Sequence, residues 1–343
     1  MSVSDWYLEN LACPRDRGTL RMVEGRLMCS RGHLYPIVSG IPVMLIEELT
    51  PTLHVMGSSL EASKRQFDPG PEEMFLETLG VDDHQRKAIL EDARKANNAI
   101  DPVVNYLISH TNGMMYRHLV GRLRAYPIPS IELPRVKGAR FLDVGCSWGR
   151  WCVASARLGY LPVGLDPSLG AVMAAQRVAK HLGVTAWFVV GDARFLPFPD
   201  DSFGVVYSYS VLQHFNLDDM RMATAEMHRV LAANGTFRIQ LANALGIRSL
   251  YHQLRRGFSK PKGFAVRYLR PKQIKCLFQP YGSDVELMPD CYFGLGLQTS
   301  DSEFMTPFKR FVLRASEVLK RAAAIFRPLP LLADSLLVSG IKM

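Results

Sequence analysis

The stretch FLDVGCSWGRW, residues 141–151, carries the strongest signal for the fold. It consists of an apolar strand that ends in an acid, a turn bounded by Gly145 and Gly149, and the start of a helix. The turn fits G-x-S-x-G, which presents a nucleophilic serine, here Ser147. It also fits a cofactor-binding turn, in which glycines let the backbone approach a ligand closely. The residues around the turn must decide between these two chemistries.

Strand and helix patterns alternate on both sides of this turn. Such alternation predicts a mostly parallel sheet covered on both faces, a Rossmann-like doubly wound α/β fold. The apolar run at 335–341 predicts one more strand that returns to the sheet. The expected strands are Arg140–Val144, Leu161–Leu165, Ala186–Val190, Val205–Ser208 and Thr236–Leu241, and the expected helices are Arg150–Leu158, Ala171–His181 and Asp218–Leu231.

The nucleophile interpretation requires an acid and then a histidine after Ser147. His214, His228 and His252 all follow aspartates, so the chain order is compatible with it. However, the sequence upstream has no His-Gly-Gly stretch of the kind that forms an oxyanion hole. The motif itself is short enough to occur by chance.

The cofactor interpretation makes more demands, and the sequence meets them. Asp143 closes the first strand, and Asp166 ends the second strand 21 residues after Gly145. An acid at that distance is placed to accept hydrogen bonds from both ribose hydroxyls of a nucleoside. A dinucleotide site would favour G-x-G-x-x-G, whereas here Ser147 stands where a middle glycine is expected. The sequence therefore predicts a nucleoside-containing cofactor, and the nucleoside need not carry phosphates.

This acid-led turn resembles the motif of the S-adenosylmethionine-dependent class I methyltransferases. The likeness continues through GDA at 191–193, LPFPDDSF at 196–203, VVYSYSVLQHF at 205–215 and EMHRVLAANGT at 226–236. These segments resemble the family's adenine-binding loop, its fourth strand beside the methyl group, and the helix and turn before its fifth strand. The resemblance covers about residues 138–243 and is greatest to the branch with small-molecule and quinone-ring methyltransferases.

The resemblance implies a set of S-adenosylmethionine contacts. Asp166, with Pro167 beside it, takes the ribose hydroxyls, and Asp192 accepts from the adenine amino group. The backbone N–H of Ala193 faces the adenine ring, and Ser210 and Gln213 lie near the transferring methyl. The turn residues at the methionine and ribose end are Gly145, Cys146, Ser147 and Gly149, with Asp143 supporting the turn.

The acceptor is less well defined. A histidine suits removal of a proton from an oxygen or nitrogen acceptor, and His214 is the candidate base. The Asn/Asp-Pro-Pro-aromatic motif for exocyclic base amines is absent, and SYSV at 208–211 holds its place. We expect a small-molecule, glycan or lipid-linked acceptor methylated at oxygen. The alternatives are an rRNA or tRNA base methyltransferase and a non-catalytic module that binds the cofactor or a partner.

The N-terminal residues read as a separate module. Cys13, Asp16, Cys29 and His33 have spacings like a zinc knuckle, with C-x-x-D in place of C-x-x-C. CPRD at 13–16, YPI at 35–37 and GIPV at 40–43 resemble the small zinc-ribbon-like activators of tRNA methyltransferases. The cysteine and histidine spacing also resembles the ribosomal RNA guanine methyltransferases. A structural zinc site and an RNA acceptor are the possibilities that these likenesses raise.

Three regions follow from the changes in pattern. Residues 1–48 form the β-rich module, 49–135 a mostly helical lid or linker, and 136–343 the methyltransferase domain. The last region contains a long segment at 244–330, where we expect acceptor specificity. Its aromatic stretches at 264–268 and 292–296 are candidates for an apolar acceptor wall, although core packing is the simpler role for most of them.

Charge is concentrated in that same segment. The 343-residue chain has a net charge of +9, and residues 244–330 hold 15 Lys and Arg against 6 Asp and Glu. Such a patch suits an anionic partner, namely nucleic acid, a phosphorylated substrate or a membrane surface, although a solvated surface has the same composition. The sequence shows no apolar run of membrane-spanning length and no secretory signal. Six cysteines in a chain of this length do not make a disulfide scaffold, so we expect a reducing, cytoplasmic setting.

Overall fold

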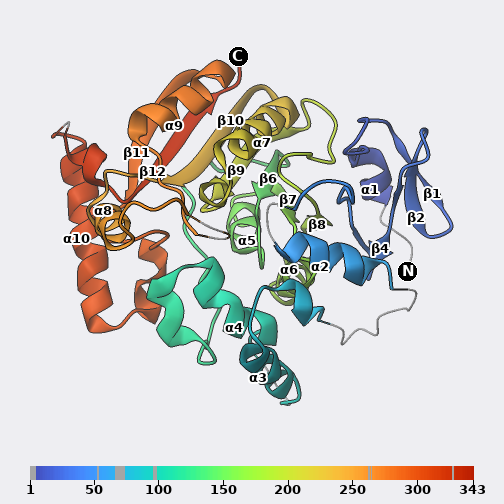
Figure 1. Ribbon diagram of the computed structural model, residues 1–343, viewed down its shortest axis with the longest axis horizontal. Coiled ribbons are helices and arrows are strands. Elements are labelled where there is room, and N and C mark those ends of the chain that lie inside the picture. The colour runs from blue at the N-terminus through green and yellow to red at the C-terminus, as the bar shows by residue number, and fades with distance from the viewer. Residues whose placement is uncertain are drawn as a thin grey trace.

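The computed structural model describes residues 5–51, 54–65, 74–95, 99–261, 263, 265–326 and 328–343. A seven-stranded sheet runs through the middle of the molecule (Figure 1), with strand order β11-β12-β10-β9-β6-β7-β8. The predicted α/β fold is confirmed, because helices pack on both faces of this sheet. Its strands are β6 (Arg140–Val144), β7 (Leu161–Asp166), β8 (Trp187–Val190), β9 (Phe203–Tyr209), β10 (Leu231–Ala242), β11 (Ser283–Cys291) and β12 (Ser335–Ile341).

The chain enters this sheet at its centre. From β6 it proceeds outward through β7 to β8, and then returns to the other side of β6 for β9 and β10. These five strands pair in parallel, whereas β12 pairs antiparallel with both β10 and β11. The strand order therefore reverses between β6 and β9. Open α/β sheets bind ligands outside the carboxyl ends of the strands at such a reversal.

Alternating side chains of the strands belong to two different cores. Val189 in β8 shares a core with residues of α7 and α9, whereas its neighbours Phe188 and Val190 pack with residues of α6. Because successive side chains in a strand point to opposite faces, these helices cover the two sides of the sheet. The covering helices are α5 (Arg150–Ala156), α6 (Leu169–His181), α7 (Leu217–Val230) and α9 (Pro271–Phe278).

The predicted final strand is confirmed, but the sequence did not reveal its neighbour. The segment 244–330 contains β11, which forms the edge of the main sheet. Asp284 and Glu286 alternate with apolar residues along it, and Pro289 removes one backbone donor. These features are tolerated because β11 is an edge strand that pairs only with β12. The segment also contains α8 (Ile247–Arg255), η4 (Gln279–Tyr281), η5 (Thr299–Phe304), α10 (Pro307–Ala323) and η6 (Leu329–Leu332).

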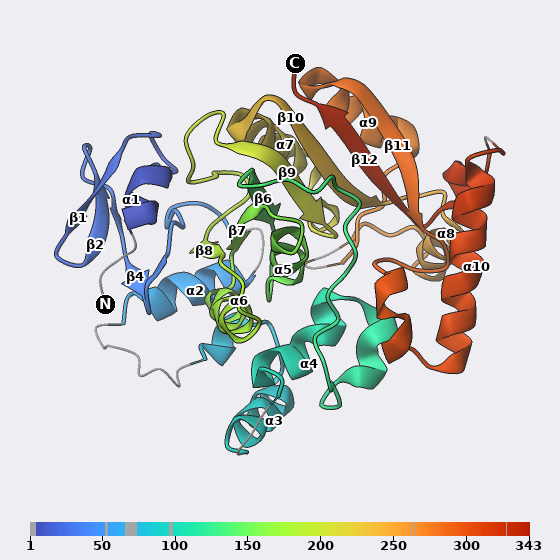
Figure 2. The ribbon, with the colours of Figure 1, turned by 180° about the vertical axis from the view of Figure 1, so that it is seen from behind.

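The N-terminal module docks on the opposite edge of the sheet, beside β8 (Figure 2). Trp6 stacks on Trp187 with ring centroids 4.5 Å apart, and the Tyr7 hydroxyl donates to the Phe188 carbonyl at 3.0 Å. The Met44 N–H donates to the Val190 carbonyl at 2.7 Å, so the module covers an otherwise open strand edge. Its elements are α1 (Asp5–Asn10), β1 (Leu20–Val23), β2 (Arg26–Cys29), β3 (Leu34–Tyr35), β4 (Ile37–Val38) and β5 (Ile41–Pro42).

In the sequence, a group of short helices lies between the N-terminal module and β6. This group packs against α6. Asp101 caps α4 by accepting from the N–H groups of Val103 and Val104, and it also pairs with Arg177 of α6. No helix within the described ranges is long and apolar enough to span a membrane. The elements of this region are α2 (His54–Ser63), η1 (Leu76–Thr78), α3 (Asp83–Ala93), α4 (Pro102–Thr111) and η2 (Met114–Leu119).

Candidate functional site

A cavity of about 990 Å³ lies at the carboxyl ends of the parallel strands. Its floor comes from the turns that follow β6, β7, β8 and β9. Residues 54–56, 79–80, 107 and 109–115 close one side. The residues that line the other side are Arg248, Ser249, His252, Arg256, Gly263, Ala265, Val266, Tyr268, Gly294, Leu295, Gly296 and Asp334. The structure therefore brings residues from two of the three predicted regions, 49–135 and 136–343, to one site.

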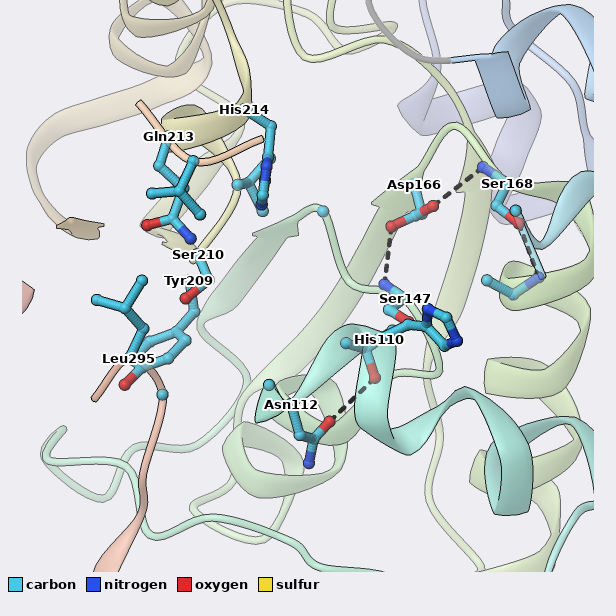
Figure 3. Close-up of a pocket in the computed structure, with 18 of the residues that line it drawn as sticks. His110, Asn112, Ser147, Asp166, Ser168, Tyr209, Ser210, Gln213, His214 and Leu295 are labelled. Atoms are coloured by element: carbon cyan, nitrogen blue, oxygen red, sulfur yellow. Dashed lines mark hydrogen bonds between the residues drawn. The ribbon is translucent and has the colours of Figure 1, made fainter. Parts of the chain in front are cut away.

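Asp166 is the central charged group of the floor (Figure 3). One carboxylate oxygen accepts from the Ser147 N–H at 2.9 Å, and the other accepts from the Ser168 N–H at 3.0 Å. Burial raises the pKa of Asp166 to about 6, although the N–H groups of Ser168 and Ser147 lower it. Each oxygen keeps a further lone pair, so the carboxylate can still accept from a diol.

The turn between β6 and α5 requires glycine for two physical reasons. Gly145 has φ 82°, and a Cβ atom there would lie 2.2 Å from Cγ2 of Val211. Ser147 also has a left-handed backbone, with φ 47°, and its buried hydroxyl forms no hydrogen bond in the described structure. Gly145, Cys146 and Ser147 line the cavity, and their contact with a cofactor stays a prediction. A turn in this conformation directs backbone rather than side chains toward a ligand.

The Ser147 hydroxyl has no hydrogen-bond partner among the described residues, so the structure gives no support to the nucleophile interpretation. A serine nucleophile requires a hydrogen-bonded base, and no described residue supplies one to this oxygen.

Two predicted residues lie behind the cavity instead of in its wall. Asp143 is fully buried below the turn, where the Cys152 thiol donates to one oxygen at 3.6 Å and the other oxygen has no described partner. Burial raises its pKa to about 8. Gly149 begins α5, and a Cβ there would crowd Ala175 at 3.1 Å. Both residues support the turn, and direct cofactor contact by them stays a prediction.

Asp192 and Ala193 line the cavity after β8, but Asp192 already has a partner. Nε of Arg194 lies 3.2 and 3.0 Å from the two oxygens of Asp192, and its Nη2 lies 2.7 Å from Oδ2. Arg194 also pairs with Asp219 and donates to the Thr50 carbonyl. This arginine was not predicted from the sequence, although an Asp-x-Arg spacing is a local signal. The contact between Asp192 and adenine stays a prediction. The adenine amino group would have to bind a carboxylate whose charge Arg194 already neutralises.

The opposite end of the cavity contains the residues that follow β9. Figure 3 shows Tyr209, Ser210, Gln213, His214 and Leu295 on the far side from Asp166. The N–H and hydroxyl of Ser210 both donate to Gln240 Oε1 at 2.9 Å. The buried amide oxygen of Gln213 has no described partner. His214 lies in η3 (Leu212–His214) and faces the same space, as a base for the acceptor requires.

The residues that close the cavity from α4 were not predicted from the sequence. Asn112 Oδ1 accepts from the Trp148 ring N–H at 3.3 Å and from the Thr111 hydroxyl at 3.0 Å, while its amide nitrogen has no described partner. His110 lies beside it, and burial lowers its pKa. No local motif marks these side chains, because only the packing of α4 on α6 brings them here.

The two aromatic stretches of the segment 244–330 have different outcomes. Tyr268, Gly294, Leu295 and Gly296 line the cavity. Tyr292 is fully buried in the core, where its hydroxyl donates to the Leu329 carbonyl. Phe264 lies outside the described residues.

The four residues predicted to bind zinc lie together in the N-terminal module. Their ligand atoms all lie within 4.8 Å of one another. His33 Nδ1 lies 3.4 Å from the Cys13 sulfur, 3.3 Å from the Cys29 sulfur and 3.2 Å from Asp16 Oδ2. Ligands about 2.0–2.3 Å from a tetrahedral ion lie roughly 3.3–3.8 Å apart, so these spacings fit such an ion. The pKa of Asp16 is lowered to about 2, chiefly by the Gly18 N–H and then by the Cys13 thiol.

Comparison with known proteins gives a family match for the central part of the chain. Residues 141–235 match the family model described as a methyltransferase domain. The uncharacterized methyltransferase YcgJ of Bacillus subtilis is 35% identical over 99 residues, which is 29% of this chain and 38% of that protein. The crystal structure of YcgJ superposes with a TM-score of 0.40 at 22% identity, covering 68% of this chain and 98% of that chain.

Two relatives carry functional names. The ubiquinone biosynthesis O-methyltransferase of Azorhizobium caulinodans is 37% identical over 24% of this chain and 33% of its own length. The ajmaline N-methyltransferase of Rauvolfia serpentina is 35% identical over 30% of this chain and 36% of its own length. The matches thus span about a third of each of these relatives. The family match covers the part of the chain from β6 to the start of β10, inside a sheet of Rossmann-like topology.

Proposed function

We propose that the whole protein is an S-adenosylmethionine-dependent methyltransferase. The observation that carries the proposal is Asp166, a half-buried carboxylate that faces a cavity large enough for a nucleoside and an acceptor together. It follows the strand next to the glycine turn, at the position where a ribose diol is bound in such folds. S-adenosylmethionine supplies a methyl group on a sulfonium that is already activated for transfer.

The residues present fit this cofactor. Ser147 and Gln213 line the cavity with buried polar atoms that lack described partners, and Asn112 adds an unpaired amide nitrogen on the opposite wall. Buried polar groups are seldom left without hydrogen bonds, so these atoms indicate a polar ligand. Asp166 would hold the ribose hydroxyls, and the Ala193 N–H would face the adenine. Asp192 would accept from the adenine amino group in competition with Arg194, whose backbone N–H and guanidinium already donate to both carboxylate oxygens.

The protein's own task is to place the acceptor and to remove its proton. The walls at the His214 end exclude water and fix the direction from which an acceptor approaches. His214 holds the proton released from an acceptor hydroxyl. For His214→Gln we expect kcat to fall about 100-fold or more and its pH dependence near neutrality to disappear, with cofactor affinity unchanged. Full activity in this variant would remove His214 from the mechanism.

For the acceptor we propose a small-molecule, glycan or lipid-linked hydroxyl. Val211, Ala265 and Leu295 give that end of the cavity an apolar wall, which suits an acceptor with an apolar body. The relative named for ubiquinone biosynthesis supports oxygen, whereas the ajmaline relative is named for nitrogen. Assays with hydroxyl and amine acceptors of the same skeleton distinguish the two atoms.

Thermal unfolding with and without S-adenosylmethionine tests the cofactor directly. A ligand at about 100 times its Kd stabilises the folded state by roughly 2.7 kcal/mol. We expect this stabilisation in the wild type and in Asp200→Ala, whose carboxylate is mostly exposed, but not in Asp166→Ala. Equal stabilisation of Asp166→Ala would refute the assignment of the ribose site.

An RNA acceptor is the second candidate, favoured by the basic segment 244–330. It predicts RNA affinity that weakens steeply with salt and methyl transfer to RNA. A third possibility is a module that binds the cofactor without turnover. That case would show the thermal stabilisation but no transfer to any acceptor in cell extract.

We also propose that Cys13, Asp16, Cys29 and His33 hold a structural zinc ion. The donor set suits zinc, and the Tyr35 hydroxyl lies 3.1 Å from the Cys13 sulfur, where it can orient that ligand. We expect metal analysis of the full chain to find one zinc per chain. Cys29→Ser should lose the ion and lower the Tm, whereas Cys276→Ser, at an exposed cysteine, should keep it. A metal-free wild type of unchanged stability in chelator would refute the site.

The cellular location stays a proposal. All six cysteines are free in the structure, which suits a reducing compartment, and we propose the cytoplasm.

A further inference from the structure

Helix α8 exposes its apolar side to solvent, while part of its polar side lines the cavity. Ile247, Leu250, Tyr251 and Leu254 follow helical spacing along one stripe, and Tyr251 and Leu254 are 57% and 58% exposed. On the opposite side, Arg248, Ser249, His252 and Arg256 line the cavity. A surface helix of a soluble protein normally has the reverse arrangement, with apolar residues facing the core. The outer stripe of α8 therefore lacks a partner among the described residues.

Helix α10 has a second stripe of this kind. Phe308 and Phe311 in its first turns are 74% and 69% exposed, and Val318 continues the same outward side. Arg314 and Arg321 alternate with them at helical spacing and are also exposed. The only acid in α10, Glu317, pairs with Lys320 at 3.1 Å. This side of α10 is therefore apolar and cationic at once.

The two stripes belong to neighbouring parts of the molecule. Figures 1 and 2 both show α8 next to α10, at the end of the molecule away from the N-terminal module. The Asn243 amide, just before α8, donates to the Leu331 carbonyl of η6 at 2.8 Å, and η6 packs against α10. Leu331 and Leu332 of η6 are themselves exposed. We call the exposed apolar and basic residues of α8, η6 and α10 the α8–α10 surface.

The positive charge of this surface indicates that its binding partner is anionic. The stretch from Ala244 to Lys260 contains no acid, and the whole segment 244–330 carries 15 basic against 6 acidic residues. Phenylalanine, leucine and tyrosine set among arginines are the composition of helices that lie in the interface of a bilayer. Anionic lipid headgroups attract such arginines, while the apolar side chains enter the acyl boundary.

We propose that the α8–α10 surface binds an anionic lipid bilayer and that the acceptor is a membrane-resident amphiphile. This rests on the proposed function, because the same α8 that carries the outer stripe lines the acceptor end of the cavity with its inner side. In this proposal an acceptor would pass from the bilayer beside α8 into the His214 end of the cavity. The surface thus both locates the protein at the membrane and presents the cavity to its lipid substrate.

Nucleic acid explains these residues less well. Phosphate contacts need the arginines but not exposed Leu254, Phe308 and Phe311, which a polyanion leaves in water. A second copy of the chain would cover the apolar stripes, but it would bring two basic surfaces of the same sign together.

Flotation of the full chain with lipid vesicles tests the proposal. The probe vesicles contain phosphatidylcholine with about one third phosphatidylglycerol, and pure phosphatidylcholine vesicles serve for comparison. We expect binding to the anionic vesicles that weakens as salt rises, and little binding to the neutral ones. The double variant Leu254→Ser/Phe311→Ser should bind at least about tenfold more weakly, because it withdraws two large apolar side chains from the acyl boundary. Arg314→Glu should weaken binding about fivefold or more.

Matched control variants distinguish vesicle binding by this surface from non-specific binding by exposed apolar side chains elsewhere. Leu90→Ser and Met222→Ser remove exposed apolar side chains elsewhere and should bind vesicles like the wild type. The proposal is overturned if all variants bind equally, if the wild type floats with neither vesicle, or if Leu254→Ser/Phe311→Ser instead abolishes a dimer seen by light scattering or binding to RNA. Thermal stabilisation by S-adenosylmethionine is measured on the same variants. Its persistence in Leu254→Ser/Phe311→Ser shows an intact fold, and its absence from the wild type would refute the cofactor while leaving vesicle binding to stand alone.

Discussion

The two ends of the cavity are built in different ways. The Asp166 end comes from turns that follow adjacent parallel strands, between residues 145 and 193, and its contacts are mostly to backbone. The His214 end combines residues after β9 with α8, the loop at 294–296 and Asp334, which lie far apart in the sequence. A binding site made by consecutive turns has a sequence motif, whereas a site assembled by tertiary packing has none. The Asp166 end is therefore a general type of binding site that a sequence motif marks, whereas the His214 end is specific to this protein.

Substitution of Arg194 is expected to have the largest effect among the tests of this difference between the two ends. If the Asp166 end were fixed by backbone alone, removing a side chain there would matter little. Arg194 is buried and pairs with Asp192 and Asp219, so Arg194→Met leaves two carboxylates without their cation. We expect a loss of about 3–5 kcal/mol in the free energy of unfolding, measured by denaturant titration.

Arg221→Met is the matched control, because Arg221 pairs with Asp218 at the exposed surface and its loss should change stability by less than about 1 kcal/mol. Asp192→Asn combined with Arg194→Met should regain part of the loss. Equal stability of the two arginine variants would mean that the buried pair is not what organises this loop.

Gly145→Ala tests the backbone part of the same end. The φ of 82° is strained for alanine, and the new Cβ would lie 2.2 Å from Val211. Strain and overpacking together predict a loss of about 2–4 kcal/mol by thermal unfolding. Gly183→Ala has φ 65° with nothing within 4 Å of the new Cβ, so it should lose only about 1–2 kcal/mol. If Val211→Ala fails to rescue Gly145→Ala, the close approach is not the cause.

These two positions also show what the sequence could predict. Gly145 was identified because a short turn between a strand and a helix leaves a local pattern, and β6 and β12 were predicted with the bounds that the structure has. Arg194 was missed because its importance depends on Asp219 and Thr50, which folding brings to it. Strand β11 was missed for a similar reason, since Pro289 and alternating charges are acceptable only at a sheet edge.

The pH dependence of cofactor affinity sharpens the role of Asp166. Its pKa is raised to about 6 by burial, above the value of 3.8 in the unfolded chain. Ionisation of such an acid weakens the folded state as pH rises from about 4 to 6, so the ligand-free protein gains nothing from the charge. A ribose diol needs the ionised form as acceptor. We expect the Kd for S-adenosylmethionine, measured by calorimetry, to be constant above pH 7 and to rise about tenfold per unit below pH 6.

Asp166→Asn is the control for this titration. It should bind weakly at every pH, with the slope below pH 6 removed. A wild-type Kd that stays constant down to pH 5 would show that this carboxylate does not titrate in contact with the cofactor.

Asp334 gives the smallest effect and tests the other end of the cavity. Its fully buried carboxylate accepts from the Ser249 N–H at 2.6 Å, in the first turn of α8, where a negative charge also stabilises the helix dipole. Asp334→Ala removes this anchor, and we expect a loss of about 1 kcal/mol in thermal unfolding. Because α8 lines only the acceptor end, stabilisation by S-adenosylmethionine should be unchanged while the KM for the acceptor rises. Asp334→Asn keeps an acceptor oxygen and should restore most of the stability. A loss of cofactor stabilisation in Asp334→Ala would show that the two ends are coupled, and the separation between a general and a specific end would fail.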